Sequence, residues 1–480
     1  MLNLEEEPKQ KTVDARKLVA ELVNKKDYGQ AEPLILKILS HQPDNIWALT
    51  ALGIVFRSTK RYVAAEACYR RAIMLNPENP EVYSNFGNLL VDMHKYDEAL
   101  KYSKMAVDLE PDTYLFHKNY AVALRETKHH AESLEQYKWC LERKPDDPDL
   151  NFDMAYISLF LRDLDTAWDY FEWRFQTKKL NIPDNFTLPK WNGENIKDKK
   201  LLVLAEQGFG DTILMTRFFD TIKEDCEDIT FSCKQPLHAL FANLPVKLIP
   251  ENNIMQEQYD YYIPLMSLPR LYSKDWLEWP EPPVMNIPQV SKDKFKWIGK
   301  HAGEKLRVGI IWSGSVTYGG NEKRAVDLPP FLELSARFPN IQFYSFQKGP
   351  REQDFKKHGM GTIMPLGHLF DDFTQTAAAL EEMDCIVMTD SAVVHLSGCL
   401  GVPVIDLLQF MPYWLYFPEE DRTPLYKTVR FIRQKISGDW DTVFGHASQI
   451  LETLSTEREE KPLSRERVIS VIDTHLKKIK

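Results

Sequence analysis

The 480-residue sequence lacks any run of 18 or more apolar residues, the length that a membrane-spanning helix needs. It also lacks an excess of basic charge, since 60 lysines and arginines face 70 aspartates and glutamates and leave a net charge of −10. The basic surface that sequence-independent nucleic-acid binding requires is therefore not expected. The first eleven residues, MLNLEEEPKQK, are acidic without an apolar core, so we expect no secretory signal.

Cysteine is scarce as well, and no two cysteines have C-x-x-C spacing. Several of them lie inside apolar runs, so we expect reduced, buried thiols and a cytoplasmic location. The six cysteines are Cys68, Cys140, Cys226, Cys233, Cys385 and Cys399.

Several nucleotide-binding and catalytic motifs are missing. The chain has no G-x-G-x-x-G turn, no P-loop and no kinase signature, which argues against a nicotinamide or flavin site and against a simple nucleotide-binding regulator. No D-x-D follows a predicted strand, so we expect no bound metal. With 44% hydrophobic residues, the chain is long enough for two to four domains, each with its own core.

A repeat occupies the first third of the chain. Prolines recur every 34 residues, which is the tetratricopeptide period, and small residues recur at matching positions between them. We therefore predict stacked helix pairs, an α-solenoid, over residues 1–175. The residues that define the period are Pro43, Pro77, Pro111 and Pro145, together with Gly53, Gly87, Ala121, Ala155, Ala65, Ala99 and Ala167.

A solenoid of this kind offers a concave face to an extended peptide or to another protein. Asn85 and Asn119 occupy equivalent positions in successive repeats and could hold a peptide backbone through paired hydrogen bonds. This part resembles in outline the superhelix of the O-GlcNAc transferases. The equivalent positions in two other repeats hold Ala51 and Asp153, and asparagine is common at this position of the repeat. Peptide binding by Asn85 and Asn119 is therefore one interpretation, and an ordinary repeat position without a ligand is the other.

A linker and a first α/β region follow. Residues 176–200 are rich in Lys, Asn, Asp and Pro, which is typical of a linker, and Trp191 is the expected anchor onto the next domain. Residues 201–205 form a predicted buried strand, 206–210 a turn, and Asp211 begins a helix. Further strands are predicted at 229–233, 246–249 and 261–265, and a crossover at 271–300.

Asp211 is the candidate general base of this first region. A carboxylate at the first strand–helix turn could take a proton from an acceptor hydroxyl. A helix N-terminus lowers the pKa of such a carboxyl, and Glu206 nearby could raise it again. A purely structural N-cap aspartate is the other interpretation, and both roles can hold at once. Besides Asp211, the acceptor-side candidates are Glu206, Gln207, Gly208 and Gly210.

A second α/β region extends from 301 to 455. Its predicted strands begin near residues 307, 341, 363, 384, 402 and 429. The strand ends place polar residues along one edge of the predicted sheet: Ser313, Ser315, Lys348 and Asp390. Arg324 or Lys348 could neutralise a leaving diphosphate. Residues 456–480 form a charged tail with a short amphipathic helix.

The stretch 384–408 is predicted to be a βαβ unit. Its turn, Asp390-Ser391-Ala392-Val393, places small residues and free N–H groups at a helix N-terminus, an arrangement that suits a phosphate. His395 follows within reach of the same ligand. The alternative is a capped helix in an ordinary sheet, with His395 merely packed.

Six short segments carry a resemblance to one enzyme family. They are WNGE (191–194), AEQGFGD (205–211), VGIIWSG (308–314), FQKG (346–349), TDSAVVHLSG (389–398) and GDW (438–440). Over roughly residues 15–455 the chain resembles bacterial proteins that join tetratricopeptide repeats to a heptosyltransferase-like glycosyltransferase of family nine.

The resemblance implies a GT-B architecture of two facing Rossmann-like lobes, at 201–300 and 301–455, with the donor bound mainly by the second lobe. It implies metal-independent, inverting transfer with Asp211 as base. The donor-phosphate motif falls on Asp390, Ser391, Ala392, Val393 and His395. Two positions depart from the pattern: Ala392 stands where glycine is common, and Leu415 stands where a basic residue often follows the tryptophan.

The expected function is therefore transfer of a sugar from a nucleotide-diphosphate donor to a hydroxyl acceptor, with no cofactor beyond the nucleotide-sugar substrate. The repeats suggest either a protein acceptor or a tethering partner. The alternative is a catalytically inactive scaffold that only binds protein partners.

Overall fold

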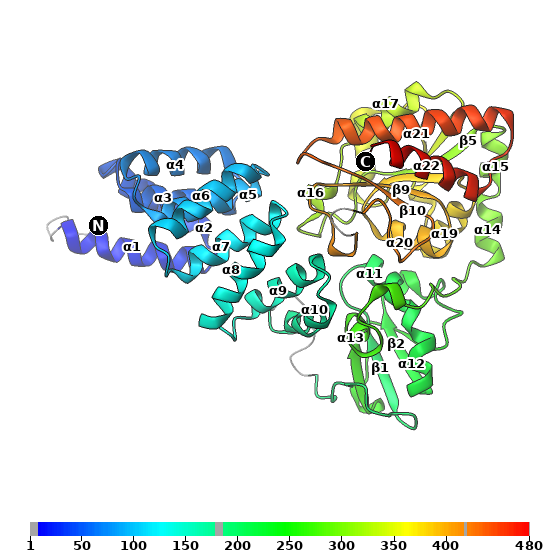
Figure 1. Ribbon diagram of the computed structural model, residues 1–480, viewed down its shortest axis with the longest axis horizontal. Helices are drawn as coiled ribbons and strands as arrows, with labels where there is room; N and C mark the ends of the chain where they lie inside the picture. Colours follow the sequence, from blue (N-terminus) through cyan, green and yellow to red (C-terminus); the bar gives the residue numbers. More distant parts are fainter. Residues whose placement is uncertain (1–7, 178–185, 417–419, 480) are drawn as a thin grey trace. The chain divides into compact units, whose positions relative to one another are not determined.

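The computed structural model describes residues 8–177, 186–416 and 420–479. The chain divides into two compact units, Met1–Leu161 and Arg162–Lys480 (Figure 1). Residues 178–185 of the predicted linker, the first seven residues of the acidic N-terminus and Phe417 lie outside the described ranges. None of the helices within those ranges is long and apolar enough to cross a bilayer.

The described part of the first unit consists of consecutive helices joined by short turns (Figure 1). They are α1 (Pro8–Asn24), α2 (Tyr28–His41), α3 (Ile46–Ser58), α4 (Tyr62–Leu75), α5 (Pro80–Asp92), α6 (Tyr96–Leu109), α7 (Tyr114–Glu126), α8 (His130–Arg143) and α9 (Pro148–Phe160).

The 34-residue period recurs in the backbone. The turns between paired helices contain non-glycine residues in the left-handed region, with φ near +60°, at Lys26, Lys60, His94 and Lys128. Small residues allow close helix packing, as the sequence predicts: a Cβ on Gly87 would lie 2.2 Å from the Ser103 hydroxyl, and one on Gly53 would lie 2.6 Å from the Tyr69 ring. The predicted helical repeat is therefore confirmed.

The second unit begins with α10 (Leu164–Phe171) and the 3₁₀ turn η1 (Glu172–Phe175). Sequence periodicity places this segment with the repeats, up to residue 175. Trp168, Phe171 and Arg174 are nevertheless almost completely buried, and the Trp168 indole N–H donates to the Lys274 carbonyl at 2.8 Å. The segment therefore contributes to the core of the second unit.

A four-stranded parallel sheet follows, in the order β3-β2-β1-β4. Its strands are β1 (Lys200–Leu204), β2 (Asp228–Cys233), β3 (Lys247–Pro250) and β4 (Tyr261–Pro264). Trp191 is 1% exposed and its backbone N–H donates to the Tyr262 carbonyl at 2.8 Å, so it anchors the linker to β4 as predicted. The helices of this part are α11 (Phe209–Met215), η2 (Thr216–Phe218), α12 (Phe219–Asp225), η3 (Gln235–Leu237), η4 (Gln256–Gln258), η5 (Leu265–Ser267), α13 (Leu268–Tyr272) and η6 (Trp276–Glu278).

The second sheet has six parallel strands in the order β10-β9-β8-β5-β6-β7, which is the strand order of a doubly wound α/β sheet. The strands are β5 (Leu306–Ile311), β6 (Ile341–Ser345), β7 (Met364–Pro365), β8 (Cys385–Thr389), β9 (Val404–Leu408) and β10 (Val429–Arg433). In such sheets ligands bind beyond the carboxyl ends of the strands, near the point where the strand order reverses, here between β5 and β8.

Helices connect these strands and cover the sheet. They are α14 (Gln289–Phe295), α15 (Trp297–Ala302), α16 (Asn321–Arg324), α17 (Pro329–Arg337), η7 (Pro350–Gln353), α18 (Asp354–His358), η8 (Gly367–Leu369), α19 (Phe373–Glu381), α20 (Ala392–Cys399), η9 (Trp414–Tyr416), α21 (Trp440–Glu460) and α22 (Arg465–Ile479).

The C-terminal helix α22 is the predicted amphipathic helix of the tail. Its apolar residues Val468, Val471, Ile472 and Leu476 are buried in one hydrophobic core with residues of β5, β9 and α21. The tail is therefore part of the second α/β core, because its apolar face covers hydrophobic surface that the sheet leaves open.

We predict that Ile472→Ala lowers the free energy of unfolding by about 2–5 kcal/mol, because the isoleucine is fully buried. Lys477→Ala, on the exposed face of the same helix, should change it by less than about 0.5 kcal/mol. Differential scanning calorimetry of both variants checks this, and equal melting temperatures would show that α22 does not contribute to the core.

Candidate functional site

Asp211 is the third residue of α11, directly after the turn that ends β1. Its carboxylate accepts a hydrogen bond from the Gly208 N–H at 3.1 Å and another from the Tyr413 hydroxyl at 3.0 Å. Gly208 occupies the N-cap position, and Asp211 stands at N3, where its carboxylate accepts from the Gly208 N–H as in a capping box. Asp211 therefore caps its own helix, from N3 and not from the N-cap position.

The pKa of Asp211 is raised above its ordinary value. Burial is the largest cause, and the negative charge of Asp390 adds to it, while the hydrogen bonds from Tyr413 and Gly208 act in the opposite direction. Burial thus outweighs the helix N-terminus, which by itself would lower the pKa. A carboxylate with a raised pKa is a stronger base.

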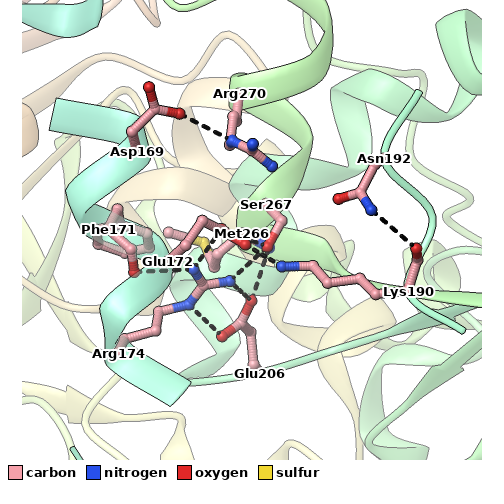
Figure 2. Close-up of polar contacts among 10 residues, drawn as sticks. All are labelled: Asp169, Phe171, Glu172, Arg174, Lys190, Asn192, Glu206, Met266, Ser267 and Arg270. Carbon is pink, nitrogen blue, oxygen red and sulfur yellow. Dashed lines mark hydrogen bonds and ion pairs between the residues drawn. The ribbon is translucent and has the colours of Figure 1, made fainter. Parts of the chain in front are cut away.

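Glu206, the predicted source of like-charge repulsion, is part of a different cluster (Figure 2). Its carboxylate accepts two hydrogen bonds from the Arg174 guanidinium, at 2.7 and 2.9 Å, and a third from the Met266 N–H at 3.0 Å. Arg174 also donates to Glu172 and Ser267, both at 2.8 Å. The cluster therefore ties η1 and η5 to the start of the β1–α11 turn.

The remaining residues of that turn differ in their surroundings. Gln207 is exposed and adopts a left-handed φ of +64°, and Gly208 beside it is also exposed. Gly210 faces α20: a Cβ at this position would lie 2.9 Å from the His395 ring and 3.2 Å from the Ala392 Cα. The absence of a side chain at Gly210 therefore lets α11 pack directly against α20.

Asp390 follows β8 and is almost completely buried. Its carboxylate accepts one hydrogen bond from Arg324 at 3.1 Å and one from the Tyr416 hydroxyl at 3.0 Å. Arg324 in turn lies under the Tyr318 ring, 4.7 Å from its centroid. Asp390 is thus held by one cation and one phenol.

The turn after Asp390 has the expected local structure. Ser391 is the N-cap of α20, and its hydroxyl accepts from the Val393 N–H at 3.4 Å. Ser391, Ala392 and Val393 are half-buried. The polar N-terminus of α20 therefore lies beside Gly210 of the first α/β region.

His395 is buried one turn further along α20. Its Nδ1 shares a hydrogen bond of 3.1 Å with the Tyr426 hydroxyl, and the Arg217 guanidinium lies 5.3 Å from the Tyr426 ring centroid. Burial lowers the pKa of His395 to about 4, even though Asp390 opposes this effect. The imidazole is therefore neutral at neutral pH.

Three predicted donor-side residues have bonds that point elsewhere. The Ser313 hydroxyl accepts from Asn321 at 3.0 Å, and the exposed Ser315 hydroxyl bonds to Thr317 at 2.8 Å. Lys348 donates to the carbonyls of Gly367 and Phe370. Of the two predicted cations, the structure places Arg324 beside Asp390, whereas Lys348 binds loop carbonyls.

Sequence reasoning missed the aromatic side of this cluster: Tyr413, Tyr416 and Tyr426. It also missed Asp406 of β9, whose carboxylate is fully buried without a hydrogen-bond partner among the described residues. Burial, with the charge of Asp390, raises the pKa of Asp406 well above its ordinary value. An acidic residue inside the apolar run VPVIDLL was the available signal for Asp406.

In the first unit, the two repeat asparagines bond within the solenoid. The Asn85 amide donates to the Glu81 carbonyl at 2.9 Å, and the Asn119 amide donates to the Ser84 hydroxyl at 2.8 Å. Both are half-buried.

Within the ranges that the structure describes, no group of three or more His, Cys, Asp or Glu residues could hold a metal ion.

Comparison with known proteins identifies the helical part. Residues 48–79 and 85–171 match two family profiles described as tetratricopeptide repeat. The helical repeats are tetratricopeptide repeats. Such repeats suggest protein–protein interaction.

The relatives found are distant. Protein FlbA of Caulobacter vibrioides is 23% identical over 338 residues, which are 63% of this chain and 54% of FlbA, so the chain spans about half the length of this curated relative. Among solved structures, Pseudomonas aeruginosa PilF is 23% identical, with a TM-score of 0.31 over 34% of this chain and 74% of PilF. MamA from Desulfovibrio magneticus is 14% identical, with a TM-score of 0.30 over 34% of this chain and 93% of MamA.

We predict that Arg174→Met destabilises the second unit by about 3–5 kcal/mol, because it leaves the buried Glu206 carboxylate without its cation. Arg270→Met is the matched control. It breaks an ion pair with Asp169, which is 61% exposed, and should cost less than about 1 kcal/mol. Calorimetric melting measures both, and a similar loss in the two variants would contradict the structural role of Arg174.

The lowered pKa of His395 makes the stability of the second unit depend on pH. In the unfolded chain this histidine binds a proton below about pH 6.5, whereas in the folded chain it does so only below about pH 4. Its contribution to stability is therefore complete above pH 6.5 and is lost as the pH falls through 4. In denaturant titrations across this range, His395→Asn should remove up to about 3 kcal/mol of the pH dependence. The exposed His358→Asn should keep it, and an unchanged slope in His395→Asn would contradict the prediction.

Proposed function

We propose that the second unit is a glycosyltransferase of GT-B architecture, in which the two parallel sheets are the two lobes. A sugar would move from a nucleotide-diphosphate donor to a hydroxyl acceptor. The contact of Gly210 with Ala392 and His395 carries the proposal, since it brings the turn of the candidate base next to the candidate phosphate turn. Strand order supports the second sheet as the nucleotide-binding lobe.

In this proposal each side chain has a defined role. Asp211 accepts the proton of the attacking hydroxyl, and its raised pKa suits that role. The departing diphosphate meets the N-terminus of α20, where Ser391 offers a hydroxyl and the backbone offers N–H groups. Arg324 supplies the positive charge beside it, already oriented by Asp390.

His395 would act as a neutral group. Because its imidazole is uncharged at neutral pH, it can offer a hydrogen bond to the diphosphate but not a full positive charge. Tyr426 fixes the orientation of the ring. The charge balance of the diphosphate therefore depends on Arg324 and on the backbone of α20.

The tetratricopeptide repeats would recruit a protein, either as the acceptor or as a tethering partner. The side-chain amides of Asn85 and Asn119 already bond within the solenoid, so a peptide would have to compete for them.

The decisive experiment incubates the protein with a panel of nucleotide sugars and measures release of nucleoside diphosphate. Asp211→Asn should lower the release rate roughly 100- to 10,000-fold, because it removes the base and leaves the shape of the side chain. Asp220→Asn, on the exposed face of α12, is the matched control and should keep the wild-type rate. Unchanged release in Asp211→Asn would exclude this residue as the base.

Binding of ADP, UDP or GDP can be measured separately by thermal shift, because a ligand of the native state raises its melting temperature. Binding without turnover would favour the inactive scaffold.

A further inference from the structure

A short turn after β9 contacts both candidate carboxylates. The Tyr416 N–H donates to the Tyr413 carbonyl at 3.0 Å and closes the turn. From it, the Tyr413 hydroxyl donates to Asp211 and the Tyr416 hydroxyl donates to Asp390, both at 3.0 Å. The same turn therefore donates one phenol to Asp211, which follows a strand of the first sheet, and another to Asp390, which follows a strand of the second sheet.

Trp414, between the two tyrosines, anchors this turn. It is 1% exposed, and its ring centroid lies 5.7 Å from that of Trp168 in α10 and 6.2 Å from that of Trp276 in η6. A buried tryptophan held on two sides restricts the backbone that carries it. The backbone that carries Tyr413 is therefore rigid, and so is the position of its phenol beside Asp211.

We propose that Tyr413 is a positioning residue for Asp211, an inference that rests on the proposed function. Its hydroxyl donates to Oδ1 of Asp211 and the Gly208 N–H donates to Oδ2, so hydrogen bonds to both oxygens fix the orientation of the carboxylate. Each carboxylate oxygen can accept more than one hydrogen bond, so an acceptor hydroxyl still finds a lone pair.

Tyr413 also favours the ionised form of Asp211, because a donor to a carboxylate stabilises its charge. This matters because the other influences on the carboxyl favour its protonation: burial and the charge of Asp390 both raise the pKa of Asp211. Tyr413 acts against both and keeps the base available at lower pH.

The other charged and titratable groups around Asp211 are already engaged. Arg324 is paired with Asp390. His395 is neutral, and Glu206 is paired with Arg174. Lys234 donates to the Gln207 carbonyl at 3.4 Å, and Tyr318 lies over Arg324. Loss of the Tyr413 hydroxyl would therefore remove a stabilising donor without adding a charge.

The test is the pH profile of nucleoside diphosphate release by the full chain, with whichever nucleotide sugar of the panel turns over. In Tyr413→Phe the acid limb should move to higher pH, because the pKa of Asp211 rises when its donor is lost. The rate on the acid side should fall about tenfold, and the plateau by less. A merely structural role would lower the plateau and leave the limb in place.

The matched control is Tyr272→Phe. Tyr272 of α13 is also half-buried and also donates to an aspartate, at 2.8 Å, but this aspartate is Asp225 and not Asp211. This variant should leave the limb unmoved. Should Tyr413→Phe fold poorly, 3-fluorotyrosine at position 413 serves instead. Its more acidic phenol is a stronger donor, so the limb should move to lower pH.

Three results would overturn the inference. A limb that stays in place in a folded, active Tyr413 variant shows that the phenol does not act on the base. A sugar found on Tyr413 by intact-protein mass spectrometry shows that it is an acceptor and not a positioning residue. A wild-type rate of nucleoside diphosphate release in Asp211→Asn shows that Asp211 is not the base, so the proposed function fails and not only the role of Tyr413.

Discussion

The candidate site depends on one close contact, the packing of α11 against α20 at Gly210. A Cβ at this position would lie 2.9 Å from the His395 ring and 3.2 Å from the Ala392 Cα, so a side chain here would require the two helices or the His395 ring to shift. Because the two helices begin directly after β1 and β8, this contact brings the polar ends of two separate parallel sheets together. Asp211, Asp390 and His395 belong to one cluster for this reason.

Burial then sets the charge state of that cluster. It raises the pKa of Asp211 and lowers that of His395, so both groups are moved towards their neutral forms. Asp390 is held instead by Arg324 and Tyr416. Burial therefore acts mainly on Asp211 and His395, whereas a cation and a phenol hold the Asp390 carboxylate in place.

The segment formed by α10 and η1, which follows the repeats, packs against the turns that carry the site residues. Arg174 holds Glu206 at the start of the β1–α11 turn, and Trp168 packs against Trp414, which carries Tyr413 beside it. Compared with a well-packed apolar pair, a buried ion pair such as Arg174 and Glu206 adds little net stability, but removal of one partner is costly because it leaves a buried charge uncompensated. Residues with the periodicity of a helical repeat therefore also shape the α/β unit.

The sequence determined the elements of this protein because their signals are local. The 34-residue period gives the helices, and short apolar runs give strands whose ends differ from the predicted ones by one or two residues. It also placed Asp390 at the carboxyl end of a strand, and Asp211 and His395 in the helices that follow two strands, since parallel strands end at one edge. Tertiary structure alone decided which partners these residues have. Tyr413 and Tyr416 reach the site, and Arg174 reaches Glu206, from positions 26 to 202 residues away from the carboxylates they bind. No spacing encodes contacts of that range. For the same reason Lys348, although it follows β6 as predicted, binds the carbonyls of a neighbouring loop.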